Sequence, residues 1–433
     1  MGQSLSMETR IADRFKSFVA VQDMENVLRS CVHCGFCLAT CPTCQILGDE
    51  RDSPRGRIYL IKALIEGKSD GEETRFHLDR CLTCRSCETT CPSGVQYGRL
   101  LGEARQLLED QVPRPWFQRL VRFGLKQGLS YPARFSLMMT LAQWIRPLLP
   151  KNLQQRVPQR TKKSISIAQH SRRVMFLAGC VQPALRPGIQ EAAMRLLDGL
   201  GISGMVSRQA GCCGALNHHL GDEAAALVQI RANIDAWWPA IEAGTIEAVI
   251  TTASACGVEV RDYGHVLRRD QHYAEKARRV SALVSDIGEF LARELGQNED
   301  EQRLALHSLG MDLSASRGKV AFQIPCTMQH GLRSQDTVQG ILRASGAELS
   351  FVDEAHLCCG SAGTYSILQP TLSNALRTRK LMHLQAGEPS VILSANLGCQ
   401  MHLEQEAEVP VVHWVEWLDQ QIMLDRQQQA IRA

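Results

Sequence analysis

Two cysteine runs with the same spacing lie fifty residues apart in the first hundred residues of the chain. Each run reads C-x2-C-x2-C-x3-C-P; the members are Cys31, Cys34, Cys37 and Cys41 in the first run and Cys81, Cys84, Cys87 and Cys91 in the second. This spacing is typical of proteins that hold two 4Fe–4S clusters, in which the fourth cysteine of each run binds the other run's cluster. It predicts one cluster on Cys31, Cys34, Cys37 and Cys91, and a second on Cys81, Cys84, Cys87 and Cys41.

Zinc is the alternative metal for paired C-x2-C units. A tetrahedral zinc site takes four ligands, however, and has no use for the third cysteine at +6 or the fourth at +10. Two complete copies therefore favour iron–sulfur chemistry over a zinc-stabilised adaptor. Cys44 is a fifth cysteine near the first run, and we interpret it as a non-ligand because the second run has no counterpart.

A second repeat, of another kind, occupies the C-terminal part of the chain. Its members are Cys180, Cys212, Cys213 and Cys256 in the first copy and Cys326, Cys358, Cys359 and Cys399 in the second. The first three positions recur after 146 residues and the last after 143, which predicts two halves of a duplicated unit. Core packing would explain one buried cysteine pair, but two matched sets favour a metal or redox site.

Short apolar runs precede these cysteines and alternate with amphipathic helical patterns. We expect strands at 174–177, around 205–206 and at 248–251 in the first copy, and at 320–324, 349–352 and 391–393 in the second. This alternation predicts parallel sheets with right-handed crossovers, whose strand carboxyl ends share one edge. Each half should therefore bring four cysteines to one edge of its sheet.

The length of 433 residues calls for two or three domains. We expect a two-cluster domain at 1–110, a basic helical linker at 111–170, the first repeat at 171–310 and the second at 311–433. The predicted fold class is α+β and multi-domain, with a mostly helical ferredoxin-like domain followed by a duplicated α/β unit. The net charge is only +3, so no nucleic-acid partner is expected.

The seventeen cysteines suggest a reducing compartment rather than a disulfide framework. No apolar signal segment is expected at the start of the chain, and no stretch reaches eighteen apolar residues. The expected linker is rich in proline, which predicts short helices, and it mixes tryptophan and other apolar residues with arginine. Such a segment suits either a membrane surface or the buried seam against a partner subunit, and we slightly favour the seam.

Charged and imidazole side chains near the cysteines are candidates for tuning the clusters. Guanidinium groups would stabilise negatively charged clusters and raise their potential; the candidates are Arg51, Arg55, Arg57, Arg80 and Arg85. Histidines near the second repeat could tune or ligate; these are His218, His219, His330 and His356. Taken singly, each arginine is equally in keeping with an ordinary solvated position, and each histidine is more often a plain surface or loop residue.

Together these features resemble the glycolate oxidase iron–sulfur subunits and, more broadly, proteins with paired cysteine-rich CCG domains. The resemblance extends almost end to end and is carried by residues 31–37, 56–62, 79–84, 233–244 and 358–365. It implies an electron-transfer subunit of a membrane-associated bacterial complex that oxidises glycolate to glyoxylate. FAD would be present only in partner flavoprotein subunits, since this chain has no glycine-rich dinucleotide fingerprint, and electrons would pass to a quinone or another acceptor.

The resemblance further implies that this chain has no catalytic residue and lies on the cytoplasmic side, peripheral to the inner membrane. Related complexes for glycerol 3-phosphate or lactate are alternatives, as is a CCG-domain disulfide reductase. The full CCG motif has five cysteines and closes on C-x-x-C, but Ala253 and Asn396 replace one cysteine in each copy. This departure argues against disulfide reduction. It leaves open one further cluster, two, or a rim of thiols used for docking; we expect at least one.

Overall fold

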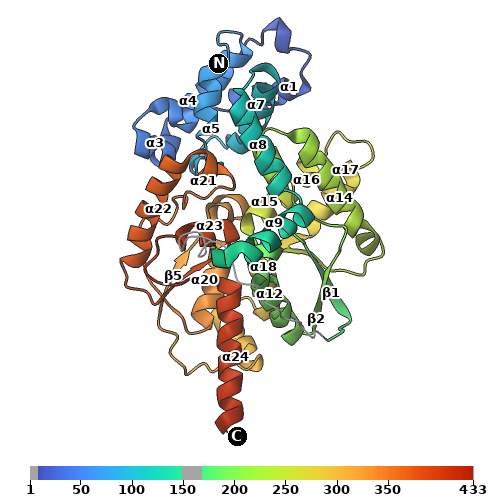
Figure 1. Cartoon of the computed structure of the whole chain (residues 1–433), viewed down its shortest axis with the longest axis vertical. Coiled ribbons are helices and arrows are strands. Elements are labelled where there is room, and N and C mark those ends of the chain that lie inside the picture. Colours follow the sequence, from blue (N-terminus) through green and yellow to red (C-terminus); the bar gives the residue numbers. More distant parts are fainter. Residues whose placement is uncertain (1–7, 149–167, 433) are drawn as a thin grey trace, which may run out of the picture.

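The computed structural model describes residues 8–148 and 168–432 of the chain. Figure 1 shows a helical N-terminal region at one end of the molecule and two α/β units below it, with a pair of linking helices across the front. The α+β multi-domain class predicted from the sequence is confirmed. Part of the expected linker, residues 149–167 with Pro150 and Pro158, lies outside the described residues.

The N-terminal region is a bundle of mostly short helices around the two cysteine loops. Its helices are α1 (Val19–Arg29), α2 (Phe36–Ala39), α3 (Pro42–Leu47), α4 (Pro54–Ile65), α5 (Glu72–Asp79), α6 (Ser86–Thr90) and α7 (Tyr97–Gln111), with 3-10 turns η1 (Asp13–Phe15) and η2 (Glu50–Asp52). The helical spacing of Ile11, Phe15, Phe18 and Val19 predicts one helix over 7–30. This prediction is wrong, because Phe18 is extended at the N-cap and α1 begins only after it. Both loops pack through α2 and α6, which contact each other.

Each α/β unit contains a four-stranded parallel sheet. The first sheet has β1 (Arg172–Phe176), β2 (Ile202–Val206), β3 (Val249–Thr251) and β4 (Val284–Asp286) in the order β2-β1-β3-β4. The second has β5 (Lys319–Gln323), β6 (Glu348–Leu349), β7 (Val391–Ser394) and β8 (Val411–His413) in the order β6-β5-β7-β8. Five expected strands are confirmed, and β6 shares only Leu349 with the strand expected at 349–352; β4 and β8 were not expected.

Helices cover both sheets and connect the two units. In the first unit they are α11 (Gln182–Leu185), α12 (Pro187–Gly199), α13 (Ala215–His219), α14 (Glu223–Glu242), α15 (Ser254–Arg261), α16 (Tyr263–Val266), α17 (Ala274–Leu283), α18 (Ile287–Leu295) and α19 (Glu299–Ser308). In the second they are η4 (Thr327–Leu332), α20 (Gln335–Ala344), α21 (Tyr365–Leu368), α22 (Pro370–Gln385), α23 (Leu397–Leu403) and α24 (Trp414–Arg432). These helices pack with the strands as the alternating pattern predicted.

The helix that directly follows the last strand of each unit packs on a helix that lies between the first two strands of the other. In one direction α18 contacts α20, and in the other α24 contacts α12. An ion pair between Arg195 on α12 and Asp419 on α24, 2.6 Å long, supports the second contact. One hydrophobic core runs across both units, with fully buried side chains such as Phe290 and Trp414. The two units are therefore parts of one packed body.

Two helices of fourteen residues, α8 (Trp116–Leu129) and α9 (Pro132–Ile145), join the N-terminal region to the first unit, followed by a 3-10 turn, η3 (Arg146–Leu148). The sequence predicted shorter pieces here. Pro132 occupies the first turn of α9, where proline is tolerated because that N–H needs no helical partner. This proline therefore begins a helix instead of breaking one. In the described ranges, no helix combines the length and apolarity that crossing a bilayer requires.

Candidate metal centres

Left-handed residues turn both N-terminal cysteine loops. His33 (φ 53°) and Gly35 (φ 86°) do so in the first loop, and Thr83 (φ 55°) and Arg85 (φ 59°) do so at the matching positions of the second. A non-glycine residue in this region costs of order 1–2 kcal/mol, and such strain collects where a function requires it. The matched backbone directs three closely spaced thiols of each loop towards one point.

Two neighbouring cavities, of about 430 and 380 Å³, lie where these thiols converge. The first is lined by Cys31, Cys34, Cys37 and Cys91, the second by Cys41, Cys81 and Cys84, and Cys87 lines both. The fourth cysteine of each run thus reaches the cavity of the other run. Cys44 lines neither cavity. The structure therefore brings together the two sets that the spacing predicts, and that each set binds a cluster stays a prediction.

The thiols of these cavities suit a soft metal centre. Burial raises the pKa of Cys37 to about 11. Burial and the nearby thiol of Cys326 raise the pKa of Cys84 well above its usual range. Thiols of this kind stay protonated in the metal-free protein, so binding iron must release their protons. The donor set therefore fits iron–sulfur clusters, which take thiolate ligands.

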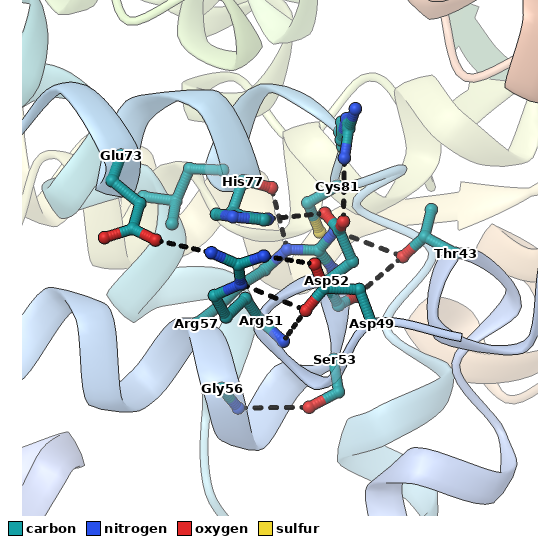
Figure 2. A network of polar contacts seen from close by, with 12 residues as sticks. Thr43, Asp49, Arg51, Asp52, Ser53, Gly56, Arg57, Glu73, His77 and Cys81 are labelled. Carbon is teal, nitrogen blue, oxygen red and sulfur yellow. Dashed lines mark hydrogen bonds and ion pairs between the residues drawn. The ribbon is translucent and has the colours of Figure 1, made fainter. Parts of the chain in front are cut away.

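A buried polar network supports the second cavity from behind (Figure 2). Arg57 is fully buried and donates from Nε to the His77 carbonyl oxygen at 2.8 Å and from Nη2 to Asp52 Oδ1 at 3.2 Å. Its Nη1 lies 4.0 Å from Cys41 Sγ. Asp52 also accepts from Arg80 Nη1 at 2.9 Å, so one carboxylate offsets two guanidinium groups. The net positive charge left at Arg57 faces the thiols.

Arg57 is distinguished from the other candidate arginines by its burial beside sulfur. All five pair with carboxylates, Arg57 and Arg80 with Asp52, Arg51 with Asp49, Arg55 with Glu50 and Arg85 with Asp262, but only Arg57 is fully buried. A further polar group near this cavity is Tyr97, whose hydroxyl lies 3.8 Å from Cys81 Sγ. The sequence did not point to Tyr97, because a tyrosine on the apolar face of a helix is most simply a core residue.

In the first α/β unit, four cysteines meet at the carboxyl edge of the sheet. Cys180 follows β1, Cys212 and Cys213 follow β2, and Cys256 lies in the first turn of α15 after β3. The Sγ atoms of Cys213 and Cys256 are 3.4 Å apart. Hydrogen bonds from Cys180 and Cys213 hold the pKa of Cys212 well below its usual range. The four thiols therefore lie together at this edge of the sheet, as the repeat predicted.

The second unit repeats this arrangement with Cys326, Cys358, Cys359 and Cys399. The Sγ atoms of Cys326 and Cys358 are 3.8 Å apart, and those of Cys359 and Cys399 are 3.0 Å apart. All are free thiols, since no disulfide joins any cysteine of the described residues. The residue that replaces the missing cysteine, Asn396, directs Nδ2 towards Cys399 Sγ at 3.6 Å.

The second N-terminal loop lies against both units. Cys84 packs in one buried cluster with Cys326 and Cys358. Thr89 Oγ1 lies 2.9 Å from His330 Nδ1 of the second unit, and Thr83 Oγ1 lies 3.3 Å from His219 Nδ1 of the first. These two histidines thus hold the loop in place. The second N-terminal cavity, which Cys84 lines, therefore lies next to the thiol site of the second unit.

Comparisons with known proteins agree with this architecture. The family model "4Fe-4S dicluster domain" matches residues 27–95, and the model "Cysteine-rich domain" matches residues 174–261 and 320–404. The first match covers both N-terminal loops, and the other two contain the two thiol edges. Iron–sulfur binding by the N-terminal region is therefore confirmed at the level of the domain.

Two curated relatives match nearly the whole chain, and a third matches about half of it. The glycolate oxidase iron–sulfur subunit of Escherichia coli K12 is 45% identical over 96% of this chain and 99% of that protein. The probable glycolate oxidase iron–sulfur subunit of Bacillus subtilis 168 is 31% identical over 89% of this chain and 90% of that protein. Lactate utilization protein A of Geobacillus thermodenitrificans is 24% identical over 53% of this chain. On this identity and coverage, the chain belongs to the family of glycolate oxidase iron–sulfur subunits.

Proposed function

We propose that this chain carries electrons out of a complex that oxidises glycolate to glyoxylate. The oxidation releases two electrons and two protons. FAD in a separate flavoprotein subunit would accept both electrons together, along with the two protons. Iron–sulfur clusters pass electrons one at a time, and this chain would conduct them to a quinone or another acceptor. The observation that carries the proposal is the pair of adjacent cavities lined by the two predicted thiol sets.

We assign the first cluster to Cys31, Cys34, Cys37 and Cys91 and the second to Cys81, Cys84, Cys87 and Cys41. We assign further clusters to the thiol edges of the two α/β units, one on Cys180, Cys212, Cys213 and Cys256 and one on Cys326, Cys358, Cys359 and Cys399. Their support is the short sulfur–sulfur distances and the packing of Cys84 against Cys326 and Cys358. No residue of this chain is assigned a catalytic role.

Iron and sulfide quantitation, together with EPR of the anaerobically purified and reduced chain, tests the cluster assignments. About eight irons would mean N-terminal clusters only, and about sixteen would place one at each thiol edge. A colourless, iron-free protein that still supports its partners would contradict the proposal. Zinc without iron would indicate an adaptor, and disulfide turnover by the isolated chain would indicate a reductase.

Reconstitution with the flavoprotein subunit tests the electron-transfer role and the substrate. The clusters should be reduced on addition of glycolate only when the flavoprotein is present. Reduction by lactate or glycerol 3-phosphate, but not glycolate, would assign the chain to a related complex. The lactate alternative is the weaker one, because the lactate utilization protein matches little more than half of this chain.

We further propose that the outer face of α8 and α9 contacts the cytoplasmic surface of the inner membrane. Two basic side chains of α8 turn inward, with Arg122 bound to Asp79 at 3.0 Å and Lys126 bound to Asp222 at 2.6 Å, whereas Arg119 stays exposed. The outer face is apolar; its exposed side chains are Trp116, Phe117, Leu120, Val121, Phe123, Leu137, Met138, Leu141, Trp144 and Ile145. Residues 111–148 contain no aspartate or glutamate, so nothing acidic in this segment repels anionic lipid.

Flotation with vesicles tests this surface. The full chain should float with vesicles that contain anionic lipid, and the variant Trp116→Ser/Leu120→Ser/Trp144→Ser should lose most of this binding. The control is Phe351→Ser, which removes an aromatic ring that is 84% exposed on the second unit. A triple variant that keeps vesicle binding but loses the flavoprotein would assign this face to the partner subunit and contradict membrane contact.

A further inference from the structure

A lysine without a carboxylate partner is buried beside the second thiol site. Lys380 lies on α22 and its side chain is 2% exposed. Its Nζ donates to the carbonyl oxygens of Ala355 at 2.9 Å and Glu354 at 3.1 Å. The carboxylate of Glu354 is itself bound by Arg379 and His383. Within residues 8–148 and 168–432, no ion pair involves Lys380.

Burying an ammonium group without an anion is strongly unfavourable, because water no longer solvates its charge. Burial accordingly lowers the pKa of Lys380, and the thiols of Cys359 and Cys358 act in the opposite direction when they are ionised. Lys380 and Cys358 also line the same narrow pocket. A cluster held by the adjacent thiolates would supply the negative charge that compensates Lys380.

The first unit holds a neutral residue at the matching position. The buried positions of α14 recur on α22 after 147 residues, as for Ile234 and Leu381, so Asn233 corresponds to Lys380. Asn233 Nδ2 donates to the Cys212 carbonyl oxygen at 2.7 Å, and its Oδ1 accepts from Gly211 N at 2.8 Å. One thiol site is therefore built against an amide and the other against a cation.

We propose that Lys380 compensates the charge of the cluster on Cys326, Cys358, Cys359 and Cys399 and raises its reduction potential above that of the cluster in the first unit. This holds if the thiol edges carry the clusters assigned above, and it adds a role for Lys380 that the assignment does not require. Reduction adds one electron, supplied through the flavoprotein, and so one negative charge. A fixed cation stabilises this more negative state. At equilibrium the electron would therefore reside mainly on the cluster of the second unit.

Anaerobic redox titrations of the full chain followed by EPR test this role. In Lys380→Met, the reduction equilibrium of one centre should fall at least tenfold, which is about 59 mV for one electron, while the other centres keep their potentials. Lys380→Arg keeps the charge and should stay within threefold of the wild type. Lys319→Met removes an exposed lysine of the same unit and should change nothing.

Iron counts separate this inference from the cluster assignment. Loss of about four irons in Lys380→Met but not in Lys380→Arg would also support a requirement for the positive charge. Equal loss in both variants would show a packing role and overturn the inference. A wild type with a cluster at the second edge, but with an unchanged potential in Lys380→Met, overturns the inference alone. A wild type with about eight irons overturns the cluster assignment and this inference together.

Discussion

The two α/β units have the same fold and the same four thiols but differ in the side chains around them. In both units the glycine after the cysteine pair, Gly214 or Gly360, adopts a left-handed conformation, with φ of 97° and 92°. A side chain at Gly360 would collide with the backbone of α22, so this turn needs glycine. The shared backbone thus positions the thiols, whereas the surrounding residues differ in charge and hydrogen bonding.

The differences fall at matched positions. Asn233 corresponds to Lys380, and Ala253 corresponds to Asn396, which contacts Cys399 Sγ. A duplicated fold can thus place two thiol sites with similar geometry in different electrostatic surroundings. Since local charge and hydrogen bonds to sulfur set the potential of a cluster, the comparison predicts two centres that are not interchangeable.

Removing one thiol from each unit should have the largest effect. Cys213→Ser and Cys359→Ser should each lose about four irons and one EPR signal, since each removes a ligand of one cluster. The double variant should lose about eight. Cys44→Ser is the control and should keep all its iron, because Cys44 lines neither N-terminal cavity. Loss of both signals in a single variant would show that the two units share one cluster.

Asn233 and Lys380 should differ in the metal-free protein. Asn233→Ala removes buried hydrogen bonds to Cys212, Gly211 and Tyr263, and should lower the free energy of unfolding by about 2–4 kcal/mol. Lys380→Met removes a buried cation without an ion-pair partner, so the same free energy should stay equal or rise. Urea denaturation of the two variants measures both changes. A large loss of stability in metal-free Lys380→Met would mean that its two hydrogen bonds outweigh the cost of its burial.

Only the first unit should show a marked pH dependence between pH 6.5 and 9. The Glu259 carboxylate, 3.0 Å away, raises the pKa of His218 to about 9, above the ordinary value near 6.5. Protonated His218 therefore stabilises the fold fully below pH 6.5, and this contribution disappears as the pH rises through 9. It should amount to about 1–2 kcal/mol, since His218 is partly exposed.

Thermal unfolding of His218→Gln across this pH range measures that contribution. The decrease in Tm of the wild type should flatten in the variant. The corresponding residue of the second unit, 146 positions later, is Thr364. Thr364→Ala should leave the slope unchanged, and an equal effect in both variants would exclude the pair of His218 and Glu259 as its source.

The smallest effect should come from Asn396→Ala. This change removes one weak hydrogen bond to Cys399 Sγ and no charge. The potential of the second-unit cluster should fall, because donors to sulfur favour the reduced state, but by less than in Lys380→Met. Redox titration of the two variants under the same conditions ranks them. A larger shift for Asn396→Ala would show that this hydrogen bond affects the reduction potential more than the charge of Lys380 does.

Most of the fold and both thiol sites could be predicted from the repeats, because strand periodicity and cysteine spacing are local patterns of the sequence. Strands β4 and β8 were missed, since each has only three residues and is followed directly by a helix. Asp286, for example, is both the last residue of β4 and the N-cap of α18. Lys380 was missed because it lies 19 residues before the nearest cysteine in the chain, Cys399. Its closeness to the thiols arises only when α22 packs on the sheet.

The packing of α24 on α12 and of α18 on α20, across the two units, affects how the chain can fold and take up iron. Since α24 covers α12 and α18 covers α20, neither unit buries its apolar surface alone. Chain cut between the units would leave two halves that expose these faces and tend to aggregate. Cluster insertion at the two α/β units should therefore follow the synthesis and packing of α24, which makes this helix a checkpoint for maturation.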